Sequence, residues 1–266
     1  MKKDIELSDL VLLAKQTGLI QREGVFKHHT VASKGHADDP VTEIDKKCED
    51  FVLDRLALLA PGHAIVTEES GIHSGDRDHV WYIDPLDGTM NFSHGIPFFC
   101  ISIGYEENGE MRMGAVYDPM RDECFYAEKG KGAFRNGEPI HVSGQTDIRN
   151  ALLATGFIQK AYEMGKDNFP SFKHMMMATA GVRRIGCAAL ELSYVACGRY
   201  DGFWDLMLRP WDVAAGFLII REAGGIVTTL SGDPDPFKEP YEFLAANPEI
   251  HAQLLQELKN GKTDAL

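Results

Sequence analysis

The chain has 266 residues, enough for one large domain or for two packed halves. Its content of 44% hydrophobic and 25% charged residues is typical of a globular protein, and its longest apolar runs have only the length of a strand, which argues against a membrane span. The formal net charge of −13, without any basic stretch, argues against direct binding of nucleic acid. An acidic protein of this kind needs metal cations to bind a phosphate group.

The cysteines and the N-terminal segment indicate the compartment. Five cysteines are odd in number, scattered, and without a C-x-x-C pair, which argues against a disulfide framework and against a structural zinc site. The first residues include two lysines, but acidic residues soon interrupt the apolar stretch and no small-residue cleavage site follows. We therefore expect a cytoplasmic protein that does not bind a membrane.

The first half of the chain predicts two helices followed by a largely antiparallel sheet. Ser8 is expected to cap a helix that runs to about Ile20. Thr42, with Asp45 three residues later, forms a variant of the capping-box pattern and predicts a helix that ends near Leu59. Short apolar runs then predict strands at 64–66, 80–83, 98–105, 111–117 and 123–127.

The second half alternates strands with helices, which is typical of an α/β unit. Strands are expected at 151–157 and 225–230, and helices at 188–198, at 211–225 and from Pro248 onward, with Asn247 as the cap of the last one. No linker or internal repeat separates the halves. We expect a single domain over 1–266 with two subdomains of about 1–145 and 146–266.

Acidic residues follow several of the predicted strands. Asp84 and Asp87 lie just after the apolar run at 80–83, Glu68 follows the run at 64–66, and Asp212 stands at the start of a helix, where a carboxylate is favoured. Pro85 favours an extended conformation for the residue before it, and the following Gly88 permits a tight turn. One such acid alone is most simply a helix cap or a solvated loop residue.

Together these acids predict a metal site beside a phosphate site. The turn leaves backbone N–H groups of residues 88–91 without partners at the start of a helix, which is a favourable site for an anion. Carboxylates that converge beside an anion would repel one another unless cations lay between them. Oxygen ligands without cysteine or histidine favour Mg²⁺, with Mn²⁺ possible, and two such ions can clamp a phosphate and activate water.

Several motifs in register resemble the signature of the inositol monophosphatase family. They are D84-P-L-D87-G-T89-x-N91, the preceding E68-E69-S70, W211-D212-V-A-A-G216, the segment DPVTEIDKKCED at 39–50, R184-I-G-C-A-A189 and REAGG at 221–225. The resemblance covers almost the whole chain in the right order. It implies a layered αβαβα sandwich, with an antiparallel sheet in the N-terminal half and a mixed sheet in the C-terminal half. It also implies a homodimer and a lithium-sensitive phosphatase that uses two or three Mg²⁺ ions.

The same resemblance implies roles for individual residues. The metal ligands are Glu68, Asp84, the backbone carbonyl of Leu86, Asp87 and Asp212, with Asp45 near a third, weaker ion. Thr89, together with Glu68, orients the attacking water and helps to deprotonate it, while the N–H groups of Gly88 and Thr89 hold the phosphate. Residues at the alcohol part of the substrate are Gly186, Cys187, Ala188 and Asp205, and Lys34 belongs to a mobile loop that folds over the site.

Two positions depart from the family pattern. Met90 stands where many members have a second threonine, and we expect little effect from it. Asp205 stands where members that hydrolyse inositol phosphate usually have glutamate, so a preference for inositol is less secure than phosphatase activity. Inositol phosphate, fructose 1,6-bisphosphate, histidinol phosphate, NADP and adenosine 3′,5′-bisphosphate all stay open as the small phosphorylated substrate.

The sequence argues against two alternative classes of protein. A haloacid-dehalogenase-type phosphatase uses a D-x-D-x-T pattern near its N-terminus, whereas the acids here are spaced D-x-x-D and begin at Asp84. A non-catalytic relative that only binds a protein partner should have lost metal ligands, and this chain retains all of those named above. A protein partner in addition to catalysis stays possible, because the acidic surface suits a basic protein.

Overall fold

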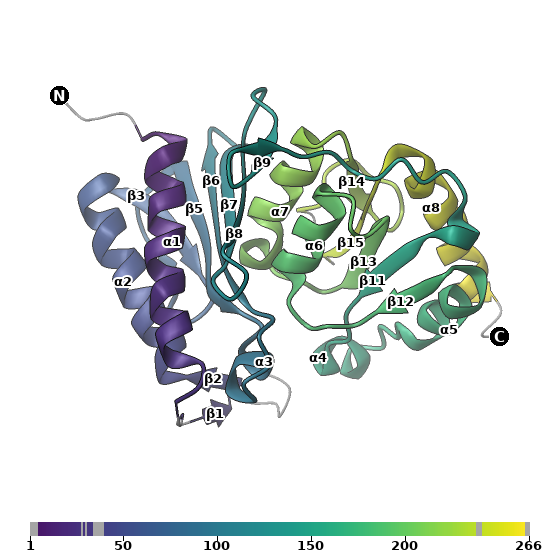
Figure 1. The fold of residues 1–266 in the computed structure, drawn as a ribbon, viewed down its shortest axis with the longest axis horizontal. Coiled ribbons are helices and arrows are strands. Elements are labelled where there is room, and N and C mark those ends of the chain that lie inside the picture. Colours follow the sequence, from purple (N-terminus) through teal and green to yellow (C-terminus); the bar gives the residue numbers. More distant parts are fainter. Residues whose placement is uncertain (1–4, 28, 30, 34–39, 238–240, 264–266) are drawn as a thin grey trace.

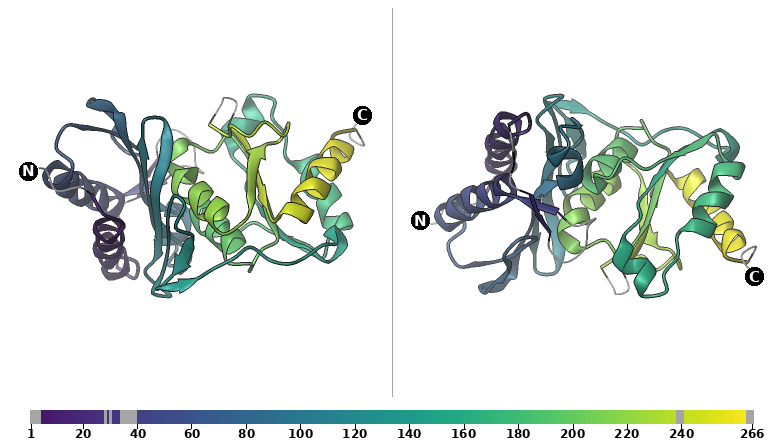
Figure 2. Two further views of the ribbon diagram at one scale, coloured as in Figure 1. Left: turned by 90° about the horizontal axis from the view of Figure 1, so that it is seen from above. Right: turned by 90° about the horizontal axis from the view of Figure 1, so that it is seen from below.

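The computed structural model describes residues 5–27, 29, 31–33, 40–237 and 241–263. The helices and sheets form five layers, helix–sheet–helix–sheet–helix, seen edge-on in Figure 1 and from above and below in Figure 2. The αβαβα sandwich is therefore confirmed. Within the described part of the chain, no helix combines the length and apolar character that crossing a membrane requires.

The first layer consists of helices α1 (Leu7–Gly24) and α2 (Glu43–Leu59). The predicted cap of α1 at Ser8 is wrong, because Glu6 is the N-cap residue and Ser8 lies within the first turn. The cap of α2 is confirmed: Thr42 and Asp45 form a capping box in which the Thr42 N–H donates to Asp45 Oδ2 at 2.8 Å.

The second layer is an eight-stranded sheet in the order β10-β9-β8-β7-β6-β5-β3-β4. Its neighbours are antiparallel, except that β3 runs parallel to β5, which confirms the largely antiparallel sheet. A separate ribbon of β1 (Val31–Ser33) and β2 (Pro40–Thr42) lies below this layer in Figure 1. The strands of the large sheet are β3 (His63–Thr67), β4 (Gly71–His73), β5 (Asp76–Asp87), β6 (Cys100–Glu107), β7 (Glu110–Asp118), β8 (Glu123–Glu128), β9 (Ala133–Arg135) and β10 (Glu138–Pro139).

Helices α6 (Ala188–Ala196) and α7 (Pro210–Glu222) form the middle layer between the two sheets. Helix α7 packs closely on β7 because both surfaces are small: a Cβ atom at Gly114 would lie 2.9 Å from Cα of Ala215. The largest core cluster joins both halves across this layer, so burial of apolar surface fixes the sheets relative to each other.

The fourth layer is a five-stranded mixed sheet in the order β12-β11-β13-β15-β14, with β12, β11 and β13 parallel and β15 antiparallel to both of its neighbours. Its strands are β11 (Leu152–Thr155), β12 (Gly181–Arg183), β13 (Gly202–Leu206), β14 (Ile226–Thr229) and β15 (Glu242–Ala246). The remaining helices are α3 (Thr89–Ser93), a 3-10 turn η1 (Ile148–Asn150), α4 (Gln159–Glu163), α5 (Phe169–Ala178) and α8 (Pro248–Thr263). Helices α5 and α8 cover the outer face of this sheet (Figure 1).

The boundary between the halves lies in the segment that connects the two sheets. The first large sheet ends at Pro139 and the second begins at Leu152. The division into subdomains of about 1–145 and 146–266 stays a prediction.

Candidate active site

The D-P-L-D segment lies at the end of β5, where the strand is interrupted by a β-bulge. Asp84 pairs with Ser102 and Asp87 with Cys100, so that Pro85 and Leu86 together face Ile101 alone. The Leu86 N–H donates to Asp84 Oδ1 at 3.0 Å, and the Leu86 carbonyl accepts from the Thr89 hydroxyl at 2.9 Å. The bulge therefore brings two carboxylates and a backbone carbonyl to one edge of the sheet.

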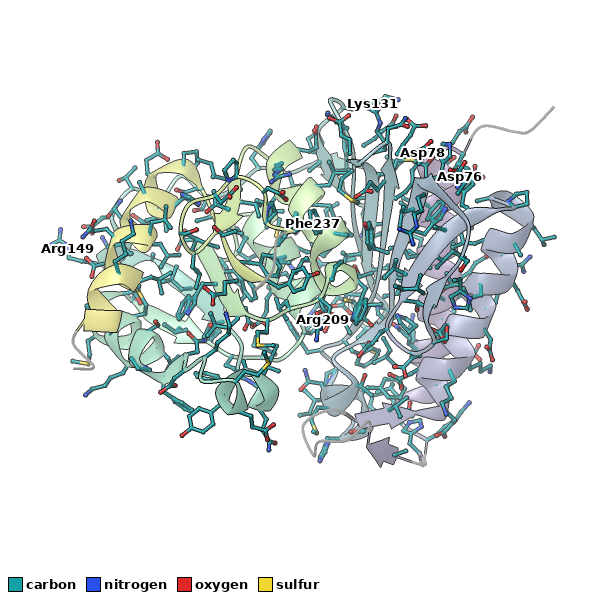
Figure 3. The ribbon with its side chains drawn as sticks, turned by 180° about the vertical axis from the view of Figure 1, so that it is seen from behind. Asp76, Asp78, Lys131, Arg149, Arg209 and Phe237 are labelled. Carbon is teal, nitrogen blue, oxygen red and sulfur yellow. The ribbon has the colours of Figure 1, made fainter. Side chains whose placement is uncertain are left out.

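Two further carboxylates reach the same place from other elements. Glu68 follows β3, whose parallel pairing with β5 sets it beside Asp84; the Glu68 N–H donates to the Ile83 carbonyl at 3.2 Å, and its side chain is hydrogen-bonded to that of Asp84. Asp212 lies in the first turn of α7, and its Oδ2 accepts a hydrogen bond of 2.6 Å from the Arg209 N–H. Arg209, labelled in Figure 3, lies between the two halves.

The carboxylates perturb one another. Burial, followed by the charges of Glu68, Asp87 and Asp212, raises the pKa of Asp84 well above its usual value. Burial and the charges of Glu68 and Asp87 likewise raise the pKa of Asp212. Burial raises the pKa of Asp87 to about 6, although hydrogen bonds from Ala189 and Cys187, in the second half of the chain, act to lower it. Such a concentration of negative charge is characteristic of a cation site.

Asp87 is held by the N-terminus of α6 and by the residue that caps it. Its Oδ2 accepts hydrogen bonds from the Ala189 N–H at 2.6 Å and from the Cys187 thiol at 3.2 Å. Cys187 Sγ also lies 3.6 Å from Cys100 Sγ, so these two thiols and Asp87 form a cluster with metal-ligand spacing. Burial raises the pKa of both thiols, that of Cys100 to about 11, and the Cys187 thiol serves here as a hydrogen-bond donor to Asp87.

Thr89 and Asp45 form the second feature of the site. The Thr89 hydroxyl lies 2.8 Å from Asp45 Oδ1 and 2.9 Å from the Leu86 carbonyl, and its single proton can be given to only one of them at a time. Burial raises the pKa of Asp45, whereas hydrogen bonds from Thr42 and Thr89 lower it.

Gly88 has a φ of +91°, and a Cβ atom there would lie 2.9 Å from the Phe98 carbonyl oxygen, so the turn requires glycine.

The acids line a cleft of about 570 Å³ between the halves. Asn91, the last residue of the D-P-L-D-G-T-x-N motif, closes one side of it: Nδ2 donates to the carbonyls of Phe98 and Ile185, both at 2.9 Å. Besides the predicted residues the lining includes Met90, Asn91, Gly156, Phe157, Ile158, Arg184, Glu191, Met207, Leu208, Arg209 and Trp211.

Asp205 lies in the cleft at the end of β13. Its Oδ1 accepts from the Leu206 N–H at 2.6 Å, and a Cβ atom at Gly156 would lie 2.1 Å from its Oδ2, so Gly156 leaves room for this carboxylate. Burial raises the pKa of Asp205 to about 7. Glu191 lies in the lining as well, with a pKa that burial raises to about 8 and with Oε1 accepting from the Ile185 N–H at 3.1 Å.

The structure brings most of the predicted site residues together. Glu68, Asp84, Leu86, Asp87, Gly88, Thr89, Gly186, Cys187, Ala188, Asp205 and Asp212 all line the cleft, and Asp45 joins them through Thr89. Lys34 lies outside the described residues. Glu191 was missed, although it is the one charged residue in the apolar helix ALELSYVA and could have been found on that ground.

The donor set fits a hard cation. The side chains that converge offer oxygen atoms from four acids, and the backbone adds the Leu86 carbonyl. One oxygen of Asp84, of Asp87 and of Asp212 accepts a backbone N–H, which fixes the orientation of each carboxylate. Mg²⁺ prefers such an all-oxygen, mainly carboxylate environment.

The fold and the site together define a layered α/β sandwich with a cleft of converging carboxylates between its two sheets. The inositol monophosphatase family model matches residues 6–263. The chain is 42% identical over 233 residues to an inositol-1-monophosphatase from Synechocystis, covering 87% of this chain and 81% of that protein. It is also 42% identical over 236 residues to the Nus factor SuhB of Escherichia coli, covering 88% of each. The chain belongs to the inositol monophosphatase family.

Solved structures agree with this assignment. The crystal structure of extragenic suppressor protein suhB from Bartonella henselae superimposes with a TM-score of 0.90 at 38% identity, covering 96% of this chain and 98% of that one. The mixed α/β fold with two main sheets is therefore that of the family.

Proposed function

We propose that this protein is a Mg²⁺-dependent phosphomonoesterase that hydrolyses inositol monophosphate or a similar small phosphate ester. The observation that carries the proposal is the convergence of Glu68, Asp84, Asp87 and Asp212 beside the Gly88–Thr89 turn. Burial and the charges of the neighbouring acids raise the pKa of Asp84 and of Asp212, so this crowding of carboxylates is unfavourable unless cations occupy the space between them. The family membership supports the same reaction class.

Glu68, Asp84, Asp87, Asp212 and the Leu86 carbonyl would hold two Mg²⁺ ions, or Mn²⁺ in their place, and Asp45 lies near a third. When bound, these cations neutralise the phosphate oxygens and lower the pKa of a water molecule. The backbone N–H groups of Gly88 and Thr89 bind the phosphate oxygens and orient the ester for in-line attack.

Proton transfer in this proposal involves Thr89 and Asp45. The Thr89 hydroxyl accepts a proton from the attacking water as its own proton passes to Asp45 Oδ1, which lies 2.8 Å from the hydroxyl oxygen, while Glu68 orients that water. Asp45 Oδ2 stays bonded to the Thr42 N–H and hydroxyl, so Oδ1 is the oxygen left to receive the proton. As the P–O bond breaks, the ester oxygen takes up a proton from solvent water, and Asp45 later returns its proton to solvent. The alcohol leaves toward the part of the cleft lined by Asp205 and Ala188.

The substrate is expected to be a small monoester with a polar alcohol. Arg184 and Arg209 place positive charge on the rim, and Asp205 and Glu191 offer hydrogen-bond partners inside. The test is a panel of inositol phosphate, glycerol phosphate, fructose 1,6-bisphosphate, histidinol phosphate, NADP and adenosine 3′,5′-bisphosphate, assayed with Mg²⁺ and with EDTA. Hydrolysis of none of them with Mg²⁺ present, or hydrolysis unaffected by EDTA, contradicts the proposal.

We also propose a homodimer and a cytoplasmic location. Large apolar side chains are exposed on α4, on α5 and in the turn between them, and a second copy of the chain would cover them. These side chains are Tyr162, Met164, Phe169, Met176 and Met177. All five cysteines are free, which suits a reducing compartment. Sedimentation velocity tests the dimer: a monomer at micromolar concentration contradicts it.

An additional protein partner is the second candidate. The relative in Escherichia coli is named a Nus factor, and the net charge of −13 suits a basic protein surface. Such a partner would act beside catalysis, because this chain keeps the full set of acids. Pull-down with the wild type and with a metal-site variant separates the two activities: binding that survives loss of hydrolysis supports this second role.

A further inference from the structure

The β-bulge at Pro85 and Leu86 leaves buried backbone groups outside the β-ladder. Both residues are buried, and two residues on β5 face one on β6. Buried carbonyl and N–H groups need hydrogen-bond partners, and here the β6 backbone cannot supply all of them. The peptide between Pro85 and Leu86 therefore depends on side chains for its orientation.

Gln21, near the end of α1, supplies the missing contact on one side. Its Nε2 donates to the Pro85 carbonyl at 2.8 Å and to the Cys100 carbonyl at 3.1 Å, using one hydrogen for each. The amide thus bridges β5 and β6 where their ladder is interrupted. If the amide were flipped, Oε1 would face two carbonyl oxygens, which cannot donate a hydrogen bond to it. The two contacts therefore fix the positions of the amide nitrogen and oxygen.

This arrangement has an energetic disadvantage that core packing alone does not explain. Gln21 is fully buried, and within the described part of the chain Oε1 has no hydrogen-bond partner. A buried acceptor without a partner is unfavourable, and an apolar side chain of the same size would avoid it. The donor end of the amide is therefore the feature that requires glutamine here.

The Pro85–Leu86 peptide is held at both ends. Its carbonyl, from Pro85, accepts from Gln21, and its N–H, from Leu86, donates to Asp84 Oδ1 at 3.0 Å. Rotation of this peptide would turn the Leu86 N–H away from Asp84 Oδ1 and break the bond that orients the Asp84 carboxylate. It would also change the spacing between Asp84 and Asp87.

We propose that Gln21 is a positioning residue for the metal centre, acting through the Pro85–Leu86 peptide rather than by touching an ion. The inference rests on the proposed metal-dependent function. Without the amide donor the acids are still present, but the Pro85–Leu86 peptide between Asp84 and Asp87 is no longer fixed. We therefore expect metal affinity to fall by more than the loss of folding stability accounts for. Loss of an outer hydrogen-bond partner of a metal site typically reduces affinity by about 10–100-fold.

The test is direct titration of the full-length protein with Mn²⁺ by calorimetry, without substrate. Gln21→Met keeps the volume and removes the donor, and we expect it to bind Mn²⁺ roughly tenfold more weakly. Leu13→Ala is the matched control: Leu13 is buried in the same helix, but its loss opens a cavity away from the bulge. We expect this control to be destabilised at least as much and to keep its Mn²⁺ affinity within about twofold, well below the roughly 10–100-fold loss that an outer hydrogen-bond partner accounts for.

Several outcomes would decide against the inference. Mn²⁺ affinity in Gln21→Met equal to that of the wild type overturns it, as does an equal loss of affinity in Gln21→Met and Leu13→Ala. If Gln21→Met does not fold, Gln21→Asn, whose shorter amide cannot reach both carbonyls, gives the same comparison. A wild type that binds no Mn²⁺ contradicts the proposed function itself, which is a different failure from normal binding by the variants.

Discussion

The N–H of Ala189 donates a hydrogen bond of 2.6 Å to Oδ2 of Asp87. The two residues are 102 positions apart: Asp87 ends β5 in the first half, and Ala189 lies in the first turn of α6 in the second. A carboxylate at a helix N-terminus is stabilised by the unpaired N–H groups and the dipole there. The cleft is therefore assembled from both halves, and its acids are oriented before any ion arrives.

Asp87→Asn should lower kcat strongly while the fold persists. Asparagine can still accept the Ala189 hydrogen bond, but it removes the negative charge from the proposed metal centre. The decrease in kcat should exceed the roughly 10–100-fold decrease that follows removal of an outer hydrogen-bond partner of a metal site. Steady-state kinetics at saturating Mg²⁺ measure it.

Asp118→Asn is the matched control for this change. Asp118 is equally an aspartate of the large sheet, fully buried, but it binds the N–H groups of Met120 and Arg121 away from the cleft. It should reduce thermal stability and leave Mg²⁺-dependent kcat near the wild-type value. Near-normal kcat in Asp87→Asn would refute its assignment as a ligand.

Thr89→Ala should reduce kcat much more than it raises KM. The substitution keeps the backbone N–H proposed to bind phosphate and removes the hydroxyl that lies 2.8 Å from Asp45 Oδ1. Loss of a positioned proton-transfer group typically costs about 10²–10⁴-fold in rate. Thr89→Ser, which retains a hydroxyl, should recover most of the activity; a raised KM with unchanged kcat in Thr89→Ala would make Thr89 a binding residue only.

Asp45→Asn tests the other member of this pair. Asp45 Oδ2 must accept from the Thr42 N–H, so an asparagine would place its oxygen there and direct its NH₂ group at Thr89. The acceptor that Thr89 faces becomes a donor, and we expect kcat to fall about as far as in Thr89→Ala. Circular dichroism should show that α2 keeps its cap. Wild-type kcat in a folded Asp45→Asn would exclude proton transfer between these residues.

The local features of this site could be predicted from the sequence, whereas its long-range contacts could not. The apolar run that ends at Ile83, together with Pro85 and Gly88, indicates a strand, two acids at its end and a turn, and all of these features depend on neighbouring residues. The bonds from Ala189 to Asp87 and from Gln21 to Pro85 depend on how helices dock on the sheet. Nothing near either donor in the sequence signals its partner.

The fold was predicted unevenly for a similar reason. Strand β13 was missed because its sequence, GFWDL, is apolar at nearly every position and lacks the alternation of a half-buried strand. The strand lies between β11 and β15 and is buried along its whole length. The layer order came from the family resemblance, since periodicity shows which face of an element is buried but not against what. The Ser8 cap was wrong because Glu6, two residues earlier, supplies the cap instead.

The effect of Mg²⁺ on stability should grow with pH. Asp84, Asp87 and Asp212 have raised pKa values in the folded protein, that of Asp87 about 6, so the folded state binds more protons than the unfolded state. These groups therefore favour folding at low pH, and their contribution is lost as pH rises through the folded pKa values. Mg²⁺ binds the deprotonated acids and restores the stability at high pH.

Differential scanning fluorimetry from pH 5 to pH 8.5, with EDTA and with Mg²⁺, measures this effect. The increase in Tm caused by Mg²⁺ should be small at the acid end and largest at the alkaline end. An Mg²⁺-induced shift of the same size at every pH would show that the raised pKa values of these acids are not linked to metal binding.

Asp205→Glu should shift the substrate preference toward inositol phosphate. In the wild type the carboxylate lines the cleft, accepts a hydrogen bond of 2.6 Å from the Leu206 N–H and lies against Gly156. One more carbon moves the acceptor by roughly 1.5 Å, enough to make or break a direct hydrogen bond to a polyol hydroxyl. A buried hydrogen bond of this kind contributes about 1–3 kcal/mol, so the ratio of kcat/KM for inositol phosphate over glycerol phosphate should rise at least about fivefold.

Asp205→Asn, which keeps the length and removes the charge, should not raise that ratio. If the ratio is unchanged in Asp205→Glu, or if the wild type already prefers inositol phosphate about a hundredfold, the upper end of what such a bond supplies, Asp205 does not limit the choice of alcohol.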